Sequence, residues 1–191
     1  MRTRTKLLIS AMVVGVLGSV AALGIFGVFS ATTQNTGNEL TAGTVAISDN
    51  DAGQAMFNVN RARPGDSWTR CIRVTYTGSL PADVHLNFGG TLGSLAQYLN
   101  AHVEDGTASP ADAFPLCDHF VTDQTLYDGP VQSGSGGFDT GLPTYPAGQS
   151  AWSTGSSVVY RITASLSSST PDAGQSQSTG NLTVFWDSQN Q

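Results

Sequence analysis

Charged residues make up only 12% of this chain of 191 residues, and lysine is absent after Lys6. Without lysine, an internal Lys–Asn isopeptide bond is excluded for the rest of the chain. Only two cysteines occur and they form no CxxC pair, so a cysteine-based zinc site or a thiol-redox site lacks its ligands. No segment carries a sustained helical stripe of apolar residues. These absences favour an all-β domain without redox chemistry.

Two common catalytic motifs are also missing. The chain has no HExxH, the arrangement by which zincins hold a metal ion on a helix, and no GxSxG elbow with a suitable acid and histidine after it. The three histidines, His85, His102 and His119, are scattered and are expected to lie at the surface or in hydrogen bonds. His85 should face the outer side of its strand, and His102 should lie near Glu104. The sequence therefore predicts no catalytic residue and no cofactor.

The chain begins with a basic cluster and a long apolar run. Arg2, Arg4 and Lys6 precede residues 7–29, which carry no charge. This layout predicts a secretory signal over residues 1–27. An uncleaved membrane anchor is the alternative, because a bilayer needs a helix of about 20 apolar residues. Since the basic residues precede the run, both outcomes place the following domain outside the cytoplasm.

The remainder of the chain is acidic and long enough for one domain. Without residues 1–27 it has five basic and fourteen acidic residues, a formal charge of −9, which argues against nucleic acid or anionic lipid as partners. We expect a secreted, extracellular protein, or one associated with the cell envelope. In that environment Cys71 and Cys117 are predicted to form a disulfide.

Two-residue periodicity predicts most of the strands. Residues 67–77 show it best, with Trp68, Ile72, Val74 and Tyr76 on one face. Residues 82–88 follow a turn and are predicted to form a hairpin with them. Other strands are expected at 55–60, 99–105, 116–127, 156–166 and 181–187, with helical turns within 91–98 and a long loop at 133–150. The pattern predicts an all-β, antiparallel two-sheet β-sandwich with one or two short helical turns.

Two groups of residues suggest ligands. Asp49 and Asp51 lie in an acidic turn that suggests Ca²⁺, although the turn departs from the EF-hand loop and lacks its distal glutamate, so turn chemistry explains it more simply. An exposed aromatic platform would indicate a carbohydrate-binding module, which stays an alternative. Its candidate residues are Tyr98, Tyr127, Tyr145 and Trp152.

Several stretches resemble the TasA/camelysin (CalY) family of secreted proteins. The first includes Phe29 and Ser30, the NTGN run at 35–38 and the LTAGTV run at 40–45. The second and most specific is PGDSWTRCIRVTYTGSLPADVHL at 64–86, and the runs VVYRITASL and LTVFWD are similar to the closing strands of the family. The chain departs from the family pattern at Ala46, where aspartate is usual, and at Tyr76, where asparagine is common.

The resemblance implies how the chain is processed and folded. In that family a dedicated (SipW-type) signal peptidase cuts just before a Phe-Ser or Phe-Asn pair, which implies cleavage near Gly27 and a mature chain that begins at Val28. A jelly-roll-like sandwich is also implied, here over residues 38–191. Because relatives are often labelled metalloproteases, a camelysin-like surface metalloprotease is the enzymatic alternative.

The leading interpretation is a secreted structural subunit of extracellular fibres or of a biofilm matrix. An incomplete sandwich exposes unpaired backbone groups, which a strand donated by a neighbouring copy can satisfy, and such head-to-tail contacts produce filaments. The expected partners are further copies of the chain, matrix polysaccharide or sibling fibre proteins, and the signal peptidase. Residues 28–37 would be a flexible N-terminal segment whose candidate donor residues are Val28, Phe29, Ser30, Ala31, Thr32, Thr33, Gln34, Asn35 and Thr36.

Overall fold

The computed structural model describes residues 43–191, except residues 111, 135, 175 and 176. The predicted signal over residues 1–27, its cleavage site at Gly27 and Val28, and the candidate donor residues 28–36 all lie outside the described residues. Within the described part of the chain, no helix is both long and apolar enough to cross a membrane.

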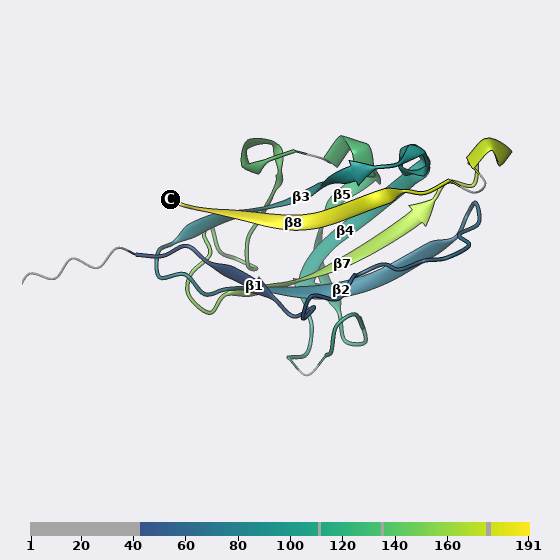
Figure 1. Cartoon of the computed structure of the whole chain (residues 1–191). Helices are drawn as coiled ribbons and strands as arrows, with labels where there is room; N and C mark the ends of the chain where they lie inside the picture. Colours follow the sequence, from purple (N-terminus) through teal and green to yellow (C-terminus); the bar gives the residue numbers. More distant parts are fainter. Residues whose placement is uncertain (1–42, 111, 135, 175–176) are drawn as a thin grey trace, which may run out of the picture. The chain divides into compact units, whose positions relative to one another are not determined.

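The strands form two antiparallel sheets (Figure 1). The larger sheet has the order β1-β2-β7-β4-β5 and the smaller has the order β6-β3-β8. Short 3₁₀ turns, η2 to η5, connect some of the strands, so the predicted all-β fold with two antiparallel sheets and short helical turns is confirmed. The bounds are β1 Ile47–Asp49, β2 Ser67–Tyr76, β3 Ala82–Leu92, η2 Ser94–Tyr98, β4 Leu99–Thr107, β5 Val121–Pro130, η3 Val131–Gly134, η4 Phe138–Thr140, β6 Leu142–Thr144, β7 Ser157–Leu166, η5 Asp172–Gly174 and β8 Gly180–Asn190.

The core lies between the two sheets and is built from alternate residues of the long strands. Strand β7 buries every second side chain, and its central Tyr160 and Ile162 are 0% and 1% exposed. From the other sheet, β3 contributes Val84, Leu86 and Phe88, which are equally buried. The face predicted for residues 67–77 is confirmed, since Ile72, Val74 and Tyr76 are also buried, and apolar side chains at every second position of all three strands leave water together.

The predicted hairpin between residues 67–77 and 82–88 is wrong. Strand β2 pairs with β1 and β7, whereas β3 pairs with β6 and β8, so the turn between them carries the chain from one sheet to the other. The turn also pairs with the segment before β1: the backbone N–H of Thr77 donates to Ala46, and that of Ser79 donates to Thr44. Alternation identifies the buried face of a strand, but it does not identify the neighbour that the backbone bonds.

Other boundaries also differ from the prediction. Residues 55–60 form no strand; Met56 and Phe57 pack their side chains against the core from an irregular segment. Strand β5 begins at Val121, so Cys117 precedes it and does not lie within it. The predicted loop at 133–150 contains the short strand β6, whose three residues are too few to give a periodic signal.

A disulfide joins Cys71 of β2 to Cys117, as predicted, with 5.2 Å between the two Cα atoms. It attaches the segment between β4 and β5 to the outer face of the larger sheet. Two hydrogen bonds to its carbonyls also hold this segment: the backbone N–H of Cys71 donates to Pro115, and the guanidinium of Arg73 donates to Ser109. This face of β2 is therefore covered although its side chains point away from the core.

Candidate functional site

A large open groove lies along one side of the sandwich. Its volume is about 1120 Å³, and its lining comes from both sheets and from irregular segments before β2 and after β7. One wall is the inward face of β2, with Trp68, Ile72 and Val74. The opposite wall is β8, whose inward residues Leu182, Val184 and Trp186 are only partly buried. The groove is therefore a place where the core is left partly open.

Strand β8 forms the edge of the smaller sheet beside this groove. It pairs with β3 along all eleven of its residues, and the sheet order gives it no second neighbour among the described strands. Proteins usually protect such an edge with lysine, proline, a bulge or a short strand. The sequence of β8, GNLTVFWDSQN, contains no lysine and no proline, and its pairing with β3 is continuous. A long edge with a free row of backbone groups is thus left beside an apolar groove.

The far side of the groove is bounded by β1, which is one of the two edge strands of the larger sheet. Only three residues of β1, Ile47 to Asp49, pair with β2. Such a short edge offers little backbone for another strand. Of the two edges that border the groove, β8 is therefore the one able to accept a full strand.

The turn that contains Asp49 and Asp51 lies at the rim of the groove and uses its carboxylates locally. Oδ1 of Asp49 accepts the backbone N–H of Asp51 at 3.2 Å, and Oδ1 of Asp51 accepts that of Gly53 at 2.6 Å. Burial raises the pKa of Asp49, and the charge of Asp51 raises it further. These bonds are those of Asx turns. The arrangement fits turn chemistry better than the Ca²⁺ site considered from the sequence.

The proposed aromatic platform does not exist as an exposed surface. Trp152 is fully buried, and its indole N–H donates to the carbonyl of Thr144 at 2.6 Å. Tyr145 is part of the periphery of the core, and its hydroxyl donates to Asp83 at 3.0 Å. The idea that Trp152 binds glycans is therefore wrong. The Gly and Ser residues around Trp152 indicate a surface loop in the sequence. The indole ring of Trp152 nevertheless points inward and is buried beneath that loop.

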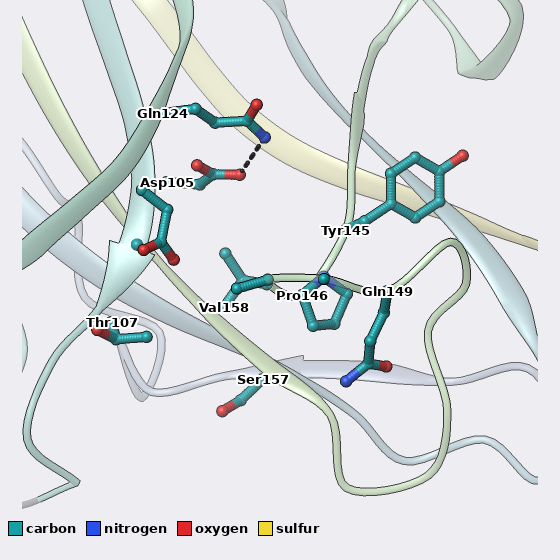
Figure 2. A pocket seen from close by; sticks show the side chains of 12 residues that line it. Asp105, Thr107, Gln124, Tyr145, Pro146, Gln149, Ser157 and Val158 are labelled. Carbon is teal, nitrogen blue, oxygen red and sulfur yellow. Dashed lines mark hydrogen bonds between the residues drawn. The ribbon is translucent and has the colours of Figure 1, made fainter.

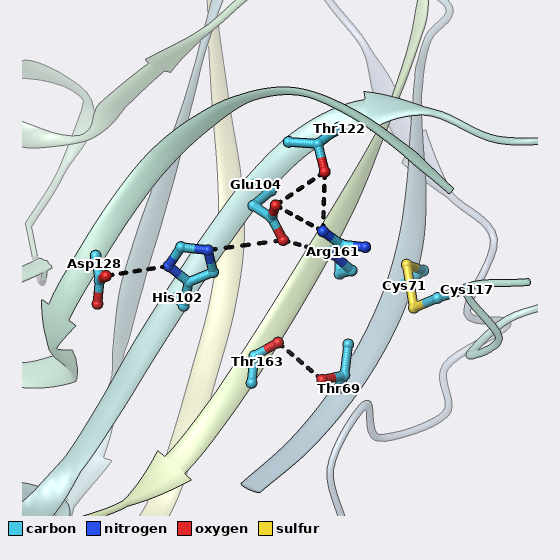
Figure 3. Close-up of polar contacts among 9 residues, drawn as sticks. All are labelled: Thr69, Cys71, His102, Glu104, Cys117, Thr122, Asp128, Arg161 and Thr163. Atoms are coloured by element: carbon cyan, nitrogen blue, oxygen red, sulfur yellow. Dashed lines mark hydrogen bonds and ion pairs between the residues drawn. A yellow bond between two sulfur atoms is a disulfide. The ribbon is translucent and has the colours of Figure 1, made fainter. Parts of the chain in front are cut away.

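Each histidine has its own set of contacts, and Figure 3 shows those of His102. His102 lies with Asp128 at 3.3 Å on one ring nitrogen and Glu104 at 3.8 Å on the other. His119 contacts Asp112 at 2.8 Å, and His85 stacks on Phe138. The prediction that these residues make surface or hydrogen-bonding contacts is confirmed.

These residues do not fit a catalytic zinc site. Such a site needs three protein ligands that converge on one point. The two carboxylates near His102 lie at opposite nitrogens of its ring, so the three groups cannot share one ion in this arrangement. Among the described residues, no three His, Cys, Asp or Glu side chains are grouped so that they could hold a metal ion.

Glu104 forms an ion pair with Arg161 on the outer face of the larger sheet (Figure 3). Arg161 of β7 binds both carboxylate oxygens, at 2.6 and 2.7 Å, and Thr122 donates to one of them at 2.9 Å. These bonds to Arg161 hold the pKa of Glu104 below its usual value, although burial opposes them. The guanidinium also lies 4.6 Å from the ring centre of Phe120. These contacts join β4, β5 and β7 to the disulfide-linked segment that contains Phe120. The role of the cluster is therefore structural.

The groove and the β8 edge were not predicted from the sequence. A signal for them was nonetheless present, because residues 181–187 alternate like an ordinary strand but carry no protective residue apart from Asp187. The sheet order, which determines whether a strand has one neighbour or two, depends on pairings between residues about 100 positions apart in the chain.

Comparison with known proteins finds a match to one family model. Residues 4–90 match the family model described as camelysin metallo-endopeptidase. This match confirms the resemblance to the TasA/camelysin family, and its described part extends from residue 43 into β3. No curated protein matches the chain in sequence.

Proposed function

Since residues 4–90 are camelysin-like, we propose that the chain is a structural subunit that assembles into extracellular fibres or matrix by donating its N-terminal segment to the groove of a second copy. The observation that carries the proposal is the free edge of β8 beside an apolar groove. The match includes the segment that would be donated, and the groove supplies a place to receive it.

The free backbone edge of β8 would make the first contribution to the binding of a donated strand. An added strand would pair its N–H and C=O groups with the free edge of β8 and extend the smaller sheet from three strands to four. Its inward side chains would cover Val184, Trp186 and the exposed part of the β2 wall. Burial of apolar area contributes about 25 cal/mol per Å². Backbone pairing and side-chain burial therefore act together.

The candidate donor has suitable length and chemistry. The side chains of residues 28–36, VFSATTQNT, carry no charge, so their transfer into the groove desolvates no ionised side chain, and the α-amino group of Val28 is the one charge that must stay in water. Nine extended residues span about 30 Å, close to the length of an eleven-residue strand such as β8. The apolar Val28 and Phe29 at the start would bury their side chains, and the polar remainder would pair through its backbone.

Export belongs to the same proposal. A signal peptidase would remove residues 1–27 and release the segment that begins at Val28. The chain would then act as a secreted protein, with retention at the cell envelope as the alternative if the apolar run stays uncleaved. Further copies of the chain would be the main partner, and sibling fibre proteins or matrix polysaccharide would be additional ones.

The test is N-terminal sequencing of the secreted protein followed by assembly of matched variants. The mature chain and a variant that lacks residues 28–34 would be compared by electron microscopy and by sedimentation over a range of concentrations. We expect filaments from the mature chain and monomers from the shortened one. A peptide of residues 28–36 should bind the shortened variant and raise its melting temperature, whereas a scrambled peptide should not. Unchanged filaments without residues 28–34 would contradict the proposal.

The family description favours a second candidate function, a metallo-endopeptidase. Metal analysis and a casein assay on the purified protein, with and without a chelator, separate it from the first candidate. Metal-dependent cleavage by the mature chain would support the peptidase. Metal-free protein without chelator-sensitive cleavage, together with filaments, would support the structural subunit.

A further inference from the structure

A second, smaller pocket lies at one end of the sandwich and is separate from the groove. Its volume is about 360 Å³, and Figure 2 shows the side chains that line it. They come from the end of β4, the beginning of β5, the loop after β6 and the beginning of β7. Its lining includes Asp105, Thr107, Asp123, Gln124, Gln149 and Ser157, and none of its twelve lining residues is basic.

An irregularity in β5 concentrates polar side chains at this pocket. Asp105 of β4 pairs with Gln124, but the next residue, Gly106, pairs with Thr122, so Asp123 has no partner in β4. Neighbouring residues of a regular strand point to opposite faces, yet Asp123 and Gln124 both line the pocket. A bulge has this effect, and bulges often occur beside functional sites. Gly106 permits it, since a Cβ there would lie 2.0 Å from the carbonyl oxygen of Val121.

Asp105 is the innermost carboxylate of the pocket. It occupies an inward position of β4, next after Ala101 and Val103, and its side chain is only 2% exposed. Oδ2 accepts a hydrogen bond from the side-chain amide of Gln124 at 2.9 Å, whereas Oδ1 makes no hydrogen bond of ordinary geometry with any described residue. A buried carboxylate oxygen without a partner is costly. A positive or hydrogen-bonding ligand at Oδ1 would remove this cost.

The charges around the pocket also favour a positively charged ligand. Burial raises the pKa of Asp105, and the nearby charge of Asp123 raises it too, against the lowering effect of the Gln124 bond. Two carboxylates share a concave site in which no lining side chain is basic. A positive charge placed between them would relieve both the repulsion and the desolvation.

We propose that this pocket binds a hard divalent cation, Ca²⁺, through the carboxylates of Asp105 and Asp123. Further oxygen donors in the lining include the amide of Gln149 and the hydroxyls of Thr107 and Ser157, and water would complete the shell. Carboxylates, amide oxygens and water suit Ca²⁺, which accepts six to eight oxygen ligands in a flexible geometry, whereas Mg²⁺ demands a near-ideal octahedron. Since only two carboxylates are present, affinity should fall in the weak range, about 10⁻⁴–10⁻³ M.

The test is a Ca²⁺ titration of the full mature chain, followed by thermal unfolding and by Tb³⁺ luminescence, for which Tyr145 in the lining can act as the sensitiser. Ca²⁺ at about 10 mM should raise the melting temperature by several degrees and displace Tb³⁺, because a ligand that binds only the folded state stabilises it. Mg²⁺ at the same concentration should have a smaller effect. Absence of any Ca²⁺ response in the wild-type chain would overturn the proposal.

Three variants assign the response to this pocket. D105N and D123N should both lose the Ca²⁺ response. D105N should also melt at a higher temperature than the wild type when no metal is present, since it removes a buried charge without changing shape. D51N is the matched control: asparagine keeps the acceptor that the turn uses, so its Ca²⁺ response should remain. A response retained in D123N, or lost in D51N alone, would overturn the proposal. These outcomes do not depend on whether filaments form.

Discussion

The hydroxyl of Tyr160 on β7 donates a hydrogen bond of 2.8 Å to Oγ1 of Thr144 on β6, and this bond joins the two sheets inside the core. Both side chains are fully buried. Thr144 in turn donates to the carbonyl of Val84 on β3 at 3.1 Å and accepts the indole N–H of Trp152 at its own carbonyl. One threonine thus connects three strands and the loop that follows β6. Burial raises the pKa of Tyr160 well above its usual value, so the hydroxyl stays protonated and remains a donor.

The first prediction concerns this cross-sheet bond. Tyr160→Phe should lower the free energy of unfolding by about 1–2 kcal/mol, because Thr144 loses a buried partner while the ring still fills the core. Urea unfolding monitored by tryptophan fluorescence measures the change. Tyr98→Phe at the end of η2 is the control, since Tyr98 is partly exposed, and it should change stability by less than about 0.5 kcal/mol. Equal effects of the two substitutions would contradict the role given to the bond.

The second prediction concerns the disulfide between Cys71 and Cys117, which are 46 positions apart. Replacement of both by serine should lower the free energy of unfolding by up to about 4 kcal/mol, because the unfolded chain gains the freedom of an open loop. Reduction of the wild-type chain should produce the same loss, measured by urea unfolding with and without dithiothreitol. If reduction leaves the unfolding midpoint unchanged, the disulfide does not stabilise the fold.

Sequence periodicity predicted the faces of the strands better than their neighbours. Residues 156–166 form a strand whose apolar side is buried, because a period of two needs only local information. The hairpin of residues 67–77 with 82–88 failed, since the pairing of β2 with β7 joins residues about 90 positions apart. The strand expected at 55–60 failed for a related reason. Met56 and Phe57 are buried as apolar residues should be, yet no neighbouring backbone bonds them into a sheet.

The candidate functional sites also depend on contacts between residues that are distant in the chain, which a sequence pattern does not reveal. Residue types identified the acidic turn at Asp49 and Asp51, but that turn satisfies its own carboxylates. Asp105 and Asp123 are separated by 18 positions and belong to no recognisable motif. A bulge brings Asp123 to the pocket, and bulges leave no periodic signal in a sequence. The groove is likewise a property of the sheet order.

The third prediction concerns pH. The folded state holds the pKa of Glu104 below its ordinary value of 4.5, so the unfolded state takes up a proton first as the pH falls. The stability contributed by the Glu104–Arg161 pair is therefore present in full above about pH 4.5 and is lost below it, as the pH falls through the lowered pKa. Stability curves between pH 3 and pH 7, obtained from urea unfolding, should show this loss in the wild-type chain.

The variant Glu104→Gln isolates this contribution. At pH 7 it should be less stable than the wild type by about 1.5–3 kcal/mol, because the amide oxygen of glutamine can accept only one of the two bonds from Arg161, without charge assistance, and its NH₂ group cannot accept the other. The difference should shrink as the pH falls below about 4.5. Asp139→Asn, which replaces an exposed carboxylate of η4, should follow the wild-type curve throughout. A difference between Glu104→Gln and the wild type that is constant with pH would show that the ion pair is not its source.

The final prediction concerns the groove, and it uses two neighbouring positions of β8. Both residues border the groove, but Val184 packs against the core, whereas Thr183, the preceding residue of the same edge strand, is exposed. A glutamate at position 184 would have to be desolvated when a strand is added, whereas a glutamate at position 183 would stay in water. Val184→Glu should therefore raise the concentration needed for filament formation at least tenfold, a loss of about 1.4 kcal/mol or more per contact. Thr183→Glu should assemble like the wild type. Sedimentation of each protein at increasing concentration measures the threshold, and circular dichroism confirms that both variants fold. If the two variants assemble equally well, the added strand does not enter this groove, and the edge of β8 is not its acceptor.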